Sequence, residues 1–240
     1  MARLVMISIF ATVLLGTPVS ATLFSFQCPV DCPESDGGGL LTQSEVTFDD
    51  VLLDFTWSAT YQESNGRLPD GFWLVVSEGR ARNQSEDGLA ILYGDGATGR
   101  VSAYVYDRDA KRDSFTSPAL FIATFEGAVS FTDLSNGERQ LELALNVSAI
   151  NSFLPDPNWK GVAFDEDIGI WAHASTGTEI VFDDVGQVLD FSKIDDSSYD
   201  RANQETVVIP EPGSLMLLAA GLIGLFRVAA SNRGTRSQVQ

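Results

Sequence analysis

The chain contains one side chain that could act as a nitrogen base near neutral pH, the single histidine His173. Nucleophilic catalysis by a Ser/His/Asp arrangement would need this imidazole beside a serine on a sharp turn. The surrounding sequence GIWAHAST has no Gly-x-Ser-x-Gly turn and alternates as a strand does. The pattern favours a histidine that packs or forms a hydrogen bond within a sheet. We therefore predict no catalytic residue and expect the protein not to be an enzyme.

Paired carboxylates would be enough to hydrolyse a glycosidic bond, and the chain is rich in acids. Glycosidases of the laminarinase type carry Glu-x-Asp-x-x-Glu on one strand. The nearest string here, Asp165-Glu166-Asp167-Ile168, does not have that spacing. A carbohydrate-active enzyme, a glycoside hydrolase or lyase with an unplaced carboxylate pair, therefore stays open as the alternative function.

Oxygen ligands for calcium recur at alternating positions in DRDAKRD, where they are Asp107, Asp109 and Asp113. Lys111 and Arg112 interrupt this run, and the glycine and terminal glutamate of an EF-hand are absent. A solvated turn is the competing interpretation. Zinc would need more nitrogen and sulfur ligands than one histidine and two cysteines provide. We expect no cofactor, with calcium as the one candidate ion.

Cys28 and Cys32 are the only cysteines and lie in the short segment CPVDC. Their spacing fits neither the redox Cys-x-x-Cys nor half of a four-cysteine zinc site. In an oxidising compartment an even number of thiols favours a bridge. A small-loop disulfide is the main interpretation, and free or intermolecular thiols and a metal or redox role remain open.

Four tryptophans could offer flat surfaces to sugar rings, but large aromatic residues in strands normally face the core. Trp159 differs because it lies in the loop sequence LPDPNWKG. We expect Trp159 to be exposed, which makes it the candidate residue for ligand binding, here carbohydrate binding.

The sequence pattern around these side chains predicts that β-strands position them. Between residues 42 and 191, short runs of apolar and aromatic residues alternate with period two, as in GFWLVVSEG and VSAYVYDRD. Tight-turn pairs such as Asn65-Gly66 and Asp70-Gly71 separate them. We predict an all-β protein, an antiparallel β-sandwich of jelly-roll type at residues 42–206, with a β-barrel as the alternative. The Pro/Gly-rich residues 22–41 are expected to be a linker.

The formal net charge is −18, and all but one of the 33 acidic residues lie within residues 22–206. Binding to a phosphate backbone depends on Lys and Arg replacing counterions. The charge therefore excludes nucleic acid as a partner.

Both termini carry the features of export signals. Arg3, an apolar stretch at residues 4–15 and the small residues Val19-Ser20-Ala21 are typical of a signal peptide. We predict that signal peptidase cleaves after Ala21 and removes residues 1–21. At the other end, twelve apolar residues, 215–226, would form a helix of about 18 Å, shorter than the about 20 residues needed to cross a bilayer. This segment predicts a short hydrophobic transmembrane helix that holds the chain in the membrane only temporarily.

Residues 207–240 contain a further pattern: Pro210-Glu211-Pro212, then the short apolar span, then arginines beginning at Arg227. This order at the extreme carboxyl end resembles the PEP-CTERM sorting signal of exopolysaccharide-producing Gram-negative bacteria. The resemblance implies recognition by an exosortase and removal of the tail near the Pro-Glu-Pro triplet. One departure from the pattern is the longer ending after Arg227, since many such tails stop sooner after the first arginines.

Residues 48–200 also resemble a group of exported PEP-CTERM proteins, most clearly in DGFWLVVSEG and RVSAYVYD. That resemblance implies a shared architecture and destination, and it carries over no catalytic residue. The expectation is therefore an exported, non-enzymatic surface or extracellular-matrix protein. It would be anchored transiently in the membrane, then reside at the cell surface or outside the cell, and associate with exopolysaccharide.

Overall fold

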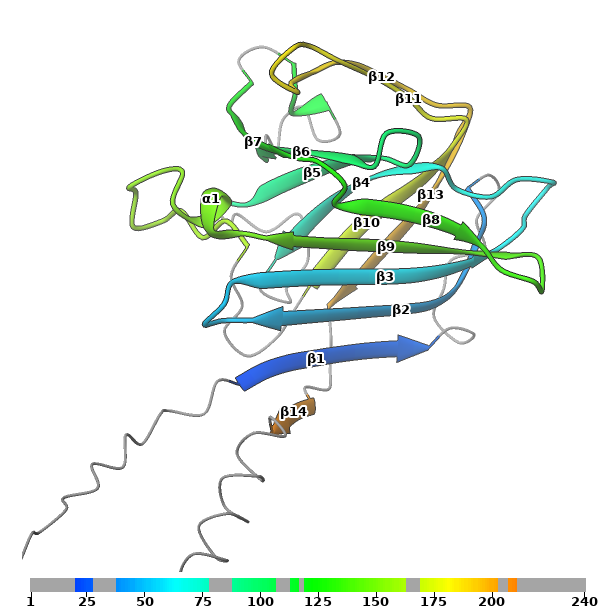
Figure 1. Ribbon diagram of the computed structural model, residues 1–240, viewed down its shortest axis with the longest axis horizontal. Helices are drawn as coiled ribbons and strands as arrows, with labels where there is room; N and C mark the ends of the chain where they lie inside the picture. The colour runs from blue at the N-terminus through cyan, green and yellow to red at the C-terminus, as the bar shows by residue number, and fades with distance from the viewer. Residues whose placement is uncertain are drawn as a thin grey trace, which may run out of the picture. The chain divides into compact units, whose positions relative to one another are not determined.

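The computed structural model describes residues 20–27, 38–77, 88–106, 113–116, 119–162, 169–202 and 207–210. Ser20–Ile209 forms one compact unit. Its strands build two six-stranded sheets and one separate two-stranded hairpin (Figure 1). Every strand pair with a defined register is antiparallel, and neither large sheet closes on itself within the described residues. The predicted all-β sandwich is confirmed.

Sheet 1 has the strand order β14-β1-β2-β3-β9-β8. Its strands are β1 (Ser20–Gln27), β2 (Leu40–Asp49), β3 (Asp54–Gln62), β8 (Val129–Asp133), β9 (Glu138–Asn146) and β14 (Val207–Pro210). Sheet 2 has the order β13-β10-β4-β5-β6-β7. Its strands are β4 (Gly71–Ser77), β5 (Ala90–Asp95), β6 (Arg100–Val105), β7 (Phe121–Phe125), β10 (Gly169–Thr176) and β13 (Asp195–Ala202). The chain passes between the sheets after β3, β7, β9 and β13.

Two smaller elements complete the described fold. Strands β11 (Glu179–Phe182) and β12 (Val188–Ser192) pair as a hairpin, which Figure 1 shows at the top of the view. A single helical turn, α1 (Ser148–Asn151), follows β9. Across the described residues we find no helix with the length and apolar character needed to cross a membrane. The predicted apolar helix at residues 215–226 lies outside them.

The core between the sheets follows directly from period-two alternation. Strand β3 buries every second side chain and leaves the residues between them partly exposed. Strand β9 alternates in the same way over its second half. The buried residues of the two strands are Phe55, Trp57, Ala59, Tyr61, Leu141, Leu143 and Leu145. The indole N–H of Trp57 donates to the Ser44 hydroxyl at 2.9 Å, so this buried polar group is satisfied.

The central strands of sheet 2 are buried on both faces. All six residues of β5 are buried, and β10 leaves only His173 partly exposed. One face of the sheet joins the core between the two sheets. The opposite face forms a second hydrophobic cluster, which we call the outer core: Trp73, Val75, Leu89, Ile91, Tyr93, Tyr104, Tyr106, Trp171, Ile180 and Val188. The last two residues come from the β11–β12 hairpin, which therefore covers sheet 2.

Gly94 in β5 is required by packing between the sheets. A Cβ atom there would overlap the ring of Phe72, which lies against this part of the β5 backbone. The Phe72 ring also meets Trp57 of sheet 1 edge-on, with the centroids 5.3 Å apart. The glycine thus allows an aromatic pair that joins the two sheets.

The compact unit is wider than the predicted domain of residues 42–206. Strand β1 occupies Ser20–Gln27, within the span predicted as the end of the signal peptide and the linker. It pairs with β2 from Ala21 opposite Asp49 to Gln27 opposite Gln43. Strand β14 reaches into the predicted sorting segment and pairs with β1. The sequence of β1, SATLFSFQ, itself alternates, which explains why it joins the sheet.

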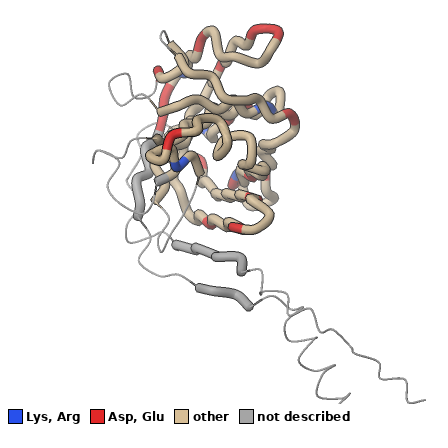
Figure 2. The backbone as a smooth tube through the Cα atoms, turned by 90° about the vertical axis from the view of Figure 1, so that its left-hand side faces the viewer, with Lys and Arg blue, Asp and Glu red and all other residues tan. Residues whose placement is uncertain are grey.

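In the part of the chain that the structure describes, several acidic side chains accept hydrogen bonds at turns. Figure 2 shows Asp and Glu at several loops. Asp49 accepts hydrogen bonds from the backbone N–H groups of Val51 and Leu52 after β2. Asp183 does the same for Val185 and Gln187 in the β11–β12 hairpin. Such bonds replace backbone pairing at reversals of the chain, so part of the acidic excess has a structural role.

Candidate functional site

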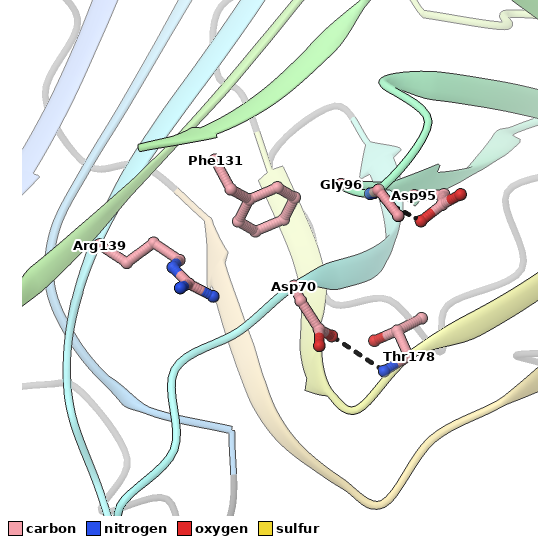
Figure 3. A pocket seen from close by; sticks show the side chains of 7 residues that line it. Asp70, Asp95, Gly96, Phe131, Arg139 and Thr178 are labelled. Atoms are coloured by element: carbon pink, nitrogen blue, oxygen red, sulfur yellow. Dashed lines mark hydrogen bonds between the residues drawn. The ribbon is translucent and has the colours of Figure 1, made fainter. Parts of the chain in front are cut away.

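One hollow in the compact unit collects polar and aromatic side chains from both sheets (Figure 3). Its volume is about 250 Å³. Sheet 1 contributes one side chain each from β8 and β9, and segments at the ends of β4, β5 and β10 contribute the rest. The lining residues are Asp70, Asp95, Gly96, Ala97, Phe131, Arg139 and Thr178. We call this feature the Asp70 hollow.

Asp70 forms hydrogen bonds to three neighbouring segments around the hollow through its side chain and its backbone. Its two carboxylate oxygens accept the backbone N–H groups of Gly177, at 3.0 Å, and Thr178, at 2.9 Å. Its own N–H donates to the Ser175 carbonyl, and its carbonyl accepts from the Gly96 N–H, both at 2.9 Å. Asp70 therefore ties the turn after β10 to the turn after β5, and its carboxylate is held in one orientation.

Asp95 fixes the turn between β5 and β6. One carboxylate oxygen accepts the N–H of Ala97 at 3.0 Å, and the other accepts the hydroxyl of Thr98 at 2.7 Å. The residue is only 5% exposed, so its buried carboxylate oxygens depend on these donors for hydrogen bonds. Asp95 lines the hollow and supports the turn.

Arg139 supplies the cationic group of the hollow. Its Nε lies 2.5 Å from Asp133 Oδ1, and its Nη1 donates to the Pro69 carbonyl at 3.1 Å. The hydrogen bond from Arg139 holds the pKa of the Asp133 carboxyl below its usual value. The guanidinium is thus oriented by one contact across the β8–β9 pair and one to the segment before β4.

Phe131 lies against the turn that contains Gly96. A Cβ at Gly96 would lie 2.5 Å from both the Phe131 ring and the Asp70 carbonyl, which is too close for any real side chain. Glycine at this position lets the ring approach the backbone. Figure 3 shows the ring together with the guanidinium of Arg139, the carboxylate of Asp70 and Thr178 around the hollow.

The Asp70 hollow combines fixed hydrogen-bond acceptors, a donor and an aromatic ring. This set suits a small polyhydroxylated molecule, whose hydroxyl groups both donate and accept. The described residues contain no group of three or more His, Cys, Asp or Glu side chains that could hold a metal ion. Of the predicted calcium ligands, Asp107 and Asp109 lie outside the described residues, and calcium at Asp107, Asp109 and Asp113 stays a prediction.

His173 is packed and hydrogen-bonded, as its sequence context predicts. Its Nδ1 lies 3.1 Å from Asp196 Oδ2, and Lys193 also contacts that carboxylate. Its ring stacks on Trp73 with the centroids 4.0 Å apart and meets Trp171 edge-on. The imidazole therefore packs against two tryptophans of the outer core.

The prediction that Trp159 is exposed is wrong. Trp159 is 9% exposed, and its indole N–H donates to the Ile150 carbonyl at 2.9 Å. The loop folds back because the N–H groups of Lys160 and Gly161 both donate to the Gly88 carbonyl. A second, smaller hollow of about 110 Å³ lies beside the ring. A role for Trp159 in ligand binding stays a prediction.

Other predicted residues fall at or beyond the edge of the described structure. Ala21, the predicted signal cleavage site, lies in β1, and Pro210 ends β14. Outside the described residues lie Cys28, Cys32, Glu211, Pro212 and Arg227. Cleavage and disulfide formation therefore stay predictions.

Sequence reasoning did not find the Asp70 hollow. It identified Asp70-Gly71 only as a turn, and it gave no role to Phe131, Arg139 or Thr178. These residues come from separate segments, and no spacing along the chain connects them. The one available signal was the Asp-Gly pair, because an aspartate before a glycine often accepts backbone N–H groups at a turn.

Comparison with known proteins identifies one segment. Residues 208–233 match the PEP-CTERM protein-sorting motif. No curated protein and no solved structure matches the chain. The resemblance predicted from the Pro-Glu-Pro triplet, the apolar span and the arginines is confirmed. The motif marks an exported chain that is sorted by exosortase and anchored transiently in the membrane before processing.

Proposed function

We propose that this exported exosortase substrate is a non-enzymatic surface or extracellular-matrix protein that associates with exopolysaccharide through its β-sandwich. The observation that carries the proposal is the PEP-CTERM motif at residues 208–233, which begins within the last two residues of the compact unit Ser20–Ile209. Removal of the tail near the motif would leave the sandwich as the part that acts at the final location, at the cell surface or outside the cell.

Processing at the amino end is compatible with this sandwich. Cleavage by signal peptidase after Ala21 would leave residues 22–27 paired with β2, from Thr22 opposite Phe48 onward. The strand would keep six of its eight residues. The mature protein therefore retains the sheet after the first cut.

The Asp70 hollow supports association with a carbohydrate. Its carboxylates already accept N–H or hydroxyl groups from neighbouring turns, which is the arrangement of a scaffold. These contacts favour the non-enzymatic function over the alternative, a glycoside hydrolase or lyase.

The proposal is tested with exopolysaccharide from the source strain. We expect the full chain to be retarded in affinity electrophoresis and to bind saturably in calorimetry, without release of reducing ends. Each measurement is made with calcium and with a chelator, because a loss of binding in chelator would identify calcium as a cofactor. Absence of binding under both conditions would refute the association. Release of reducing ends would establish the enzyme instead.

A further inference from the structure

We propose that the Asp70 hollow binds a single neutral sugar ring, with Phe131 beneath the apolar face of the ring and Asp70, Thr178 and Arg139 on its hydroxyl groups. This inference rests on the proposed association with exopolysaccharide and adds the class of sugar and the residues that recognise it.

The volume of the hollow limits the size of the ligand. Pockets for drug-sized ligands measure about 300–1,000 Å³. The Asp70 hollow, at about 250 Å³, is slightly smaller and lies open to solvent on one side. It therefore fits one ring of a longer chain, whose neighbouring units would extend into solvent.

The polar groups retain unused hydrogen-bonding capacity. Each carboxylate oxygen of Asp70 accepts one backbone N–H, which leaves a second lone pair on each oxygen for a ligand hydroxyl. Arg139 uses Nε and Nη1 for protein contacts. Within the described residues, no hydrogen bond involves its Nη2. A donor and an acceptor thus face the hollow, as recognition of adjacent hydroxyl groups requires.

Thr178 adds a third polar contact. Its hydroxyl lies 2.9 Å from the Ser175 hydroxyl, and either oxygen can act as the donor. Its methyl group packs against Gly71, where a Cβ would lie 2.5 Å away. The side chain is therefore held in place, while the remaining hydrogen-bonding capacity of its oxygen is available to a ligand.

Phe131 provides the apolar surface. The residue is partly exposed and packs one edge of its ring on Gly96. The apolar C–H face of a pyranose can cover a flat aromatic ring and remove both surfaces from water. The combination of one ring with three fixed polar groups matches a molecule that has one apolar face and a rim of hydroxyl groups.

Charge selects a neutral sugar over an acidic one. The hollow has two carboxylates, and its guanidinium is already paired with Asp133. The whole chain has a net charge of −18. A uronic acid or a sulfated sugar would meet like charges at short and at long range. A neutral ring avoids both costs.

The hollow is also organised before a ligand arrives. Backbone and side-chain hydrogen bonds fix Asp70, Arg139 and the turns on either side of them. Binding would therefore order few protein groups, which lowers its entropic cost. A weak but specific interaction with each ring, repeated along a polymer, is the expected outcome.

The test measures binding of small neutral sugars to the full chain in a zwitterionic detergent without a sugar headgroup. The probes are the methyl glycosides of glucose, galactose and mannose, with glucuronate as the charged comparison, and ligand-observed NMR gives the dissociation constants. We expect saturable binding of at least one neutral glycoside and at least tenfold weaker binding of glucuronate. Saturable binding of glucuronate alone, or of none of the probes, would overturn the inference.

Variants locate the site. Phe131→Leu keeps the apolar volume but loses the flat ring, and Thr178→Val keeps the shape but loses the hydroxyl. We expect Phe131→Leu to weaken binding of the neutral glycoside at least tenfold and Thr178→Val to weaken it severalfold. Arg139→Gln would also weaken it, and its thermal unfolding is compared with that of the wild type because this residue supports two segments. The matched control, Asn158→Ala in the second hollow, leaves binding unchanged.

The variants also separate this inference from the proposed function. If the wild type binds exopolysaccharide and Phe131→Leu binds it equally well, the association stands and the role of the hollow is refuted. If the wild type binds the neutral glycoside but not the polymer, the hollow stands and the association with that exopolysaccharide is refuted. An equal loss of glycoside binding in Asn158→Ala would place the site elsewhere.

Discussion

Sheet 1 and sheet 2 have the same number of strands but bury different amounts of surface. In sheet 1, β3 and β9 alternate between buried and exposed residues, so one face packs and the other meets solvent. In sheet 2, β5 is buried on both faces, because the β11–β12 hairpin and Phe115 cover its outer side. Alternation in the sequence therefore reveals that one face of a sheet is buried. Whether the opposite face is also buried depends on which other segments of the chain pack over it.

The largest effect is expected where the two sheets share a residue. Phe72→Ala removes a fully buried ring that contacts Trp57 of the opposite sheet, and it should lower the free energy of unfolding by about 3–5 kcal/mol. Urea unfolding of the full chain measures this change. Ser58→Ala on the solvent side of β3 is the control and should stay within about 0.5 kcal/mol. A loss below about 1 kcal/mol in Phe72→Ala would contradict a shared core.

The hairpin allows a direct test of the outer core. Ile180→Ala removes a side chain packed on sheet 2 and should cost about 2–4 kcal/mol, because it leaves a cavity under the hairpin. Its neighbour Val181 is 42% exposed, so Val181→Ala should change the free energy of unfolding by about 0.5 kcal/mol or less. Equal effects of the two substitutions would show that the hairpin does not cover sheet 2.

Several hydrogen bonds fasten the hairpin to sheet 2: the Gly186 carbonyl accepts from the Ser102 and Thr124 hydroxyls, and a further bond joins Val188 to Tyr104. The N–H of Val188 donates to the Tyr104 hydroxyl at 2.6 Å, in a buried position. Tyr104→Phe leaves that N–H without an acceptor and should cost about 1–3 kcal/mol. Hydrogen exchange at the Val188 amide should become faster, while the amides of β3 in sheet 1 keep their protection. Unchanged protection at Val188 would contradict the contact.

A further change in stability is expected only at alkaline pH. Burial raises the pKa of Tyr104 to about 12 and also raises the pKa values of Tyr61 and Tyr93, above the usual value near 10. The unfolded chain therefore loses these protons first, so the stabilisation is complete below about pH 10 and is lost as pH rises from 10 toward 12. Each such tyrosine contributes a slope of about 1.4 kcal/mol per pH unit.

The variant Tyr104→Phe isolates the contribution of Tyr104 to the pH dependence of the free energy of unfolding. Urea unfolding between pH 9 and pH 11 should give the variant a shallower decline than the wild type, by up to about 1.4 kcal/mol per pH unit above pH 10. Identical slopes would mean that the Tyr104 hydroxyl titrates normally in the folded protein. Tyr61, in the core between the sheets, should behave like Tyr104 if both cores exclude water equally.

Sequence reasoning succeeded where a local pattern has one physical cause. The alternation in β3 and the pair Asn65-Gly66 were both interpreted correctly, and the pair adopts positive φ values of 53° and 73°. It failed for Trp159, whose loop looks exposed along the chain but folds back under hydrogen bonds to Gly88. It also missed β1, because a proline- and glycine-rich neighbourhood outweighed a short alternating run.

The sequence by itself determined the sorting signal and the class of fold. A sorting motif is contiguous in residues 208–233, and strand alternation repeats every two residues, so both can be recognised without knowing any distant contact. Only the tertiary structure decided that the central strands of sheet 2 are buried on both faces and that Asp70, Phe131 and Arg139 surround one hollow. These features join side chains from segments far apart in the chain, and their proximity depends on how the sheets and turns pack in space.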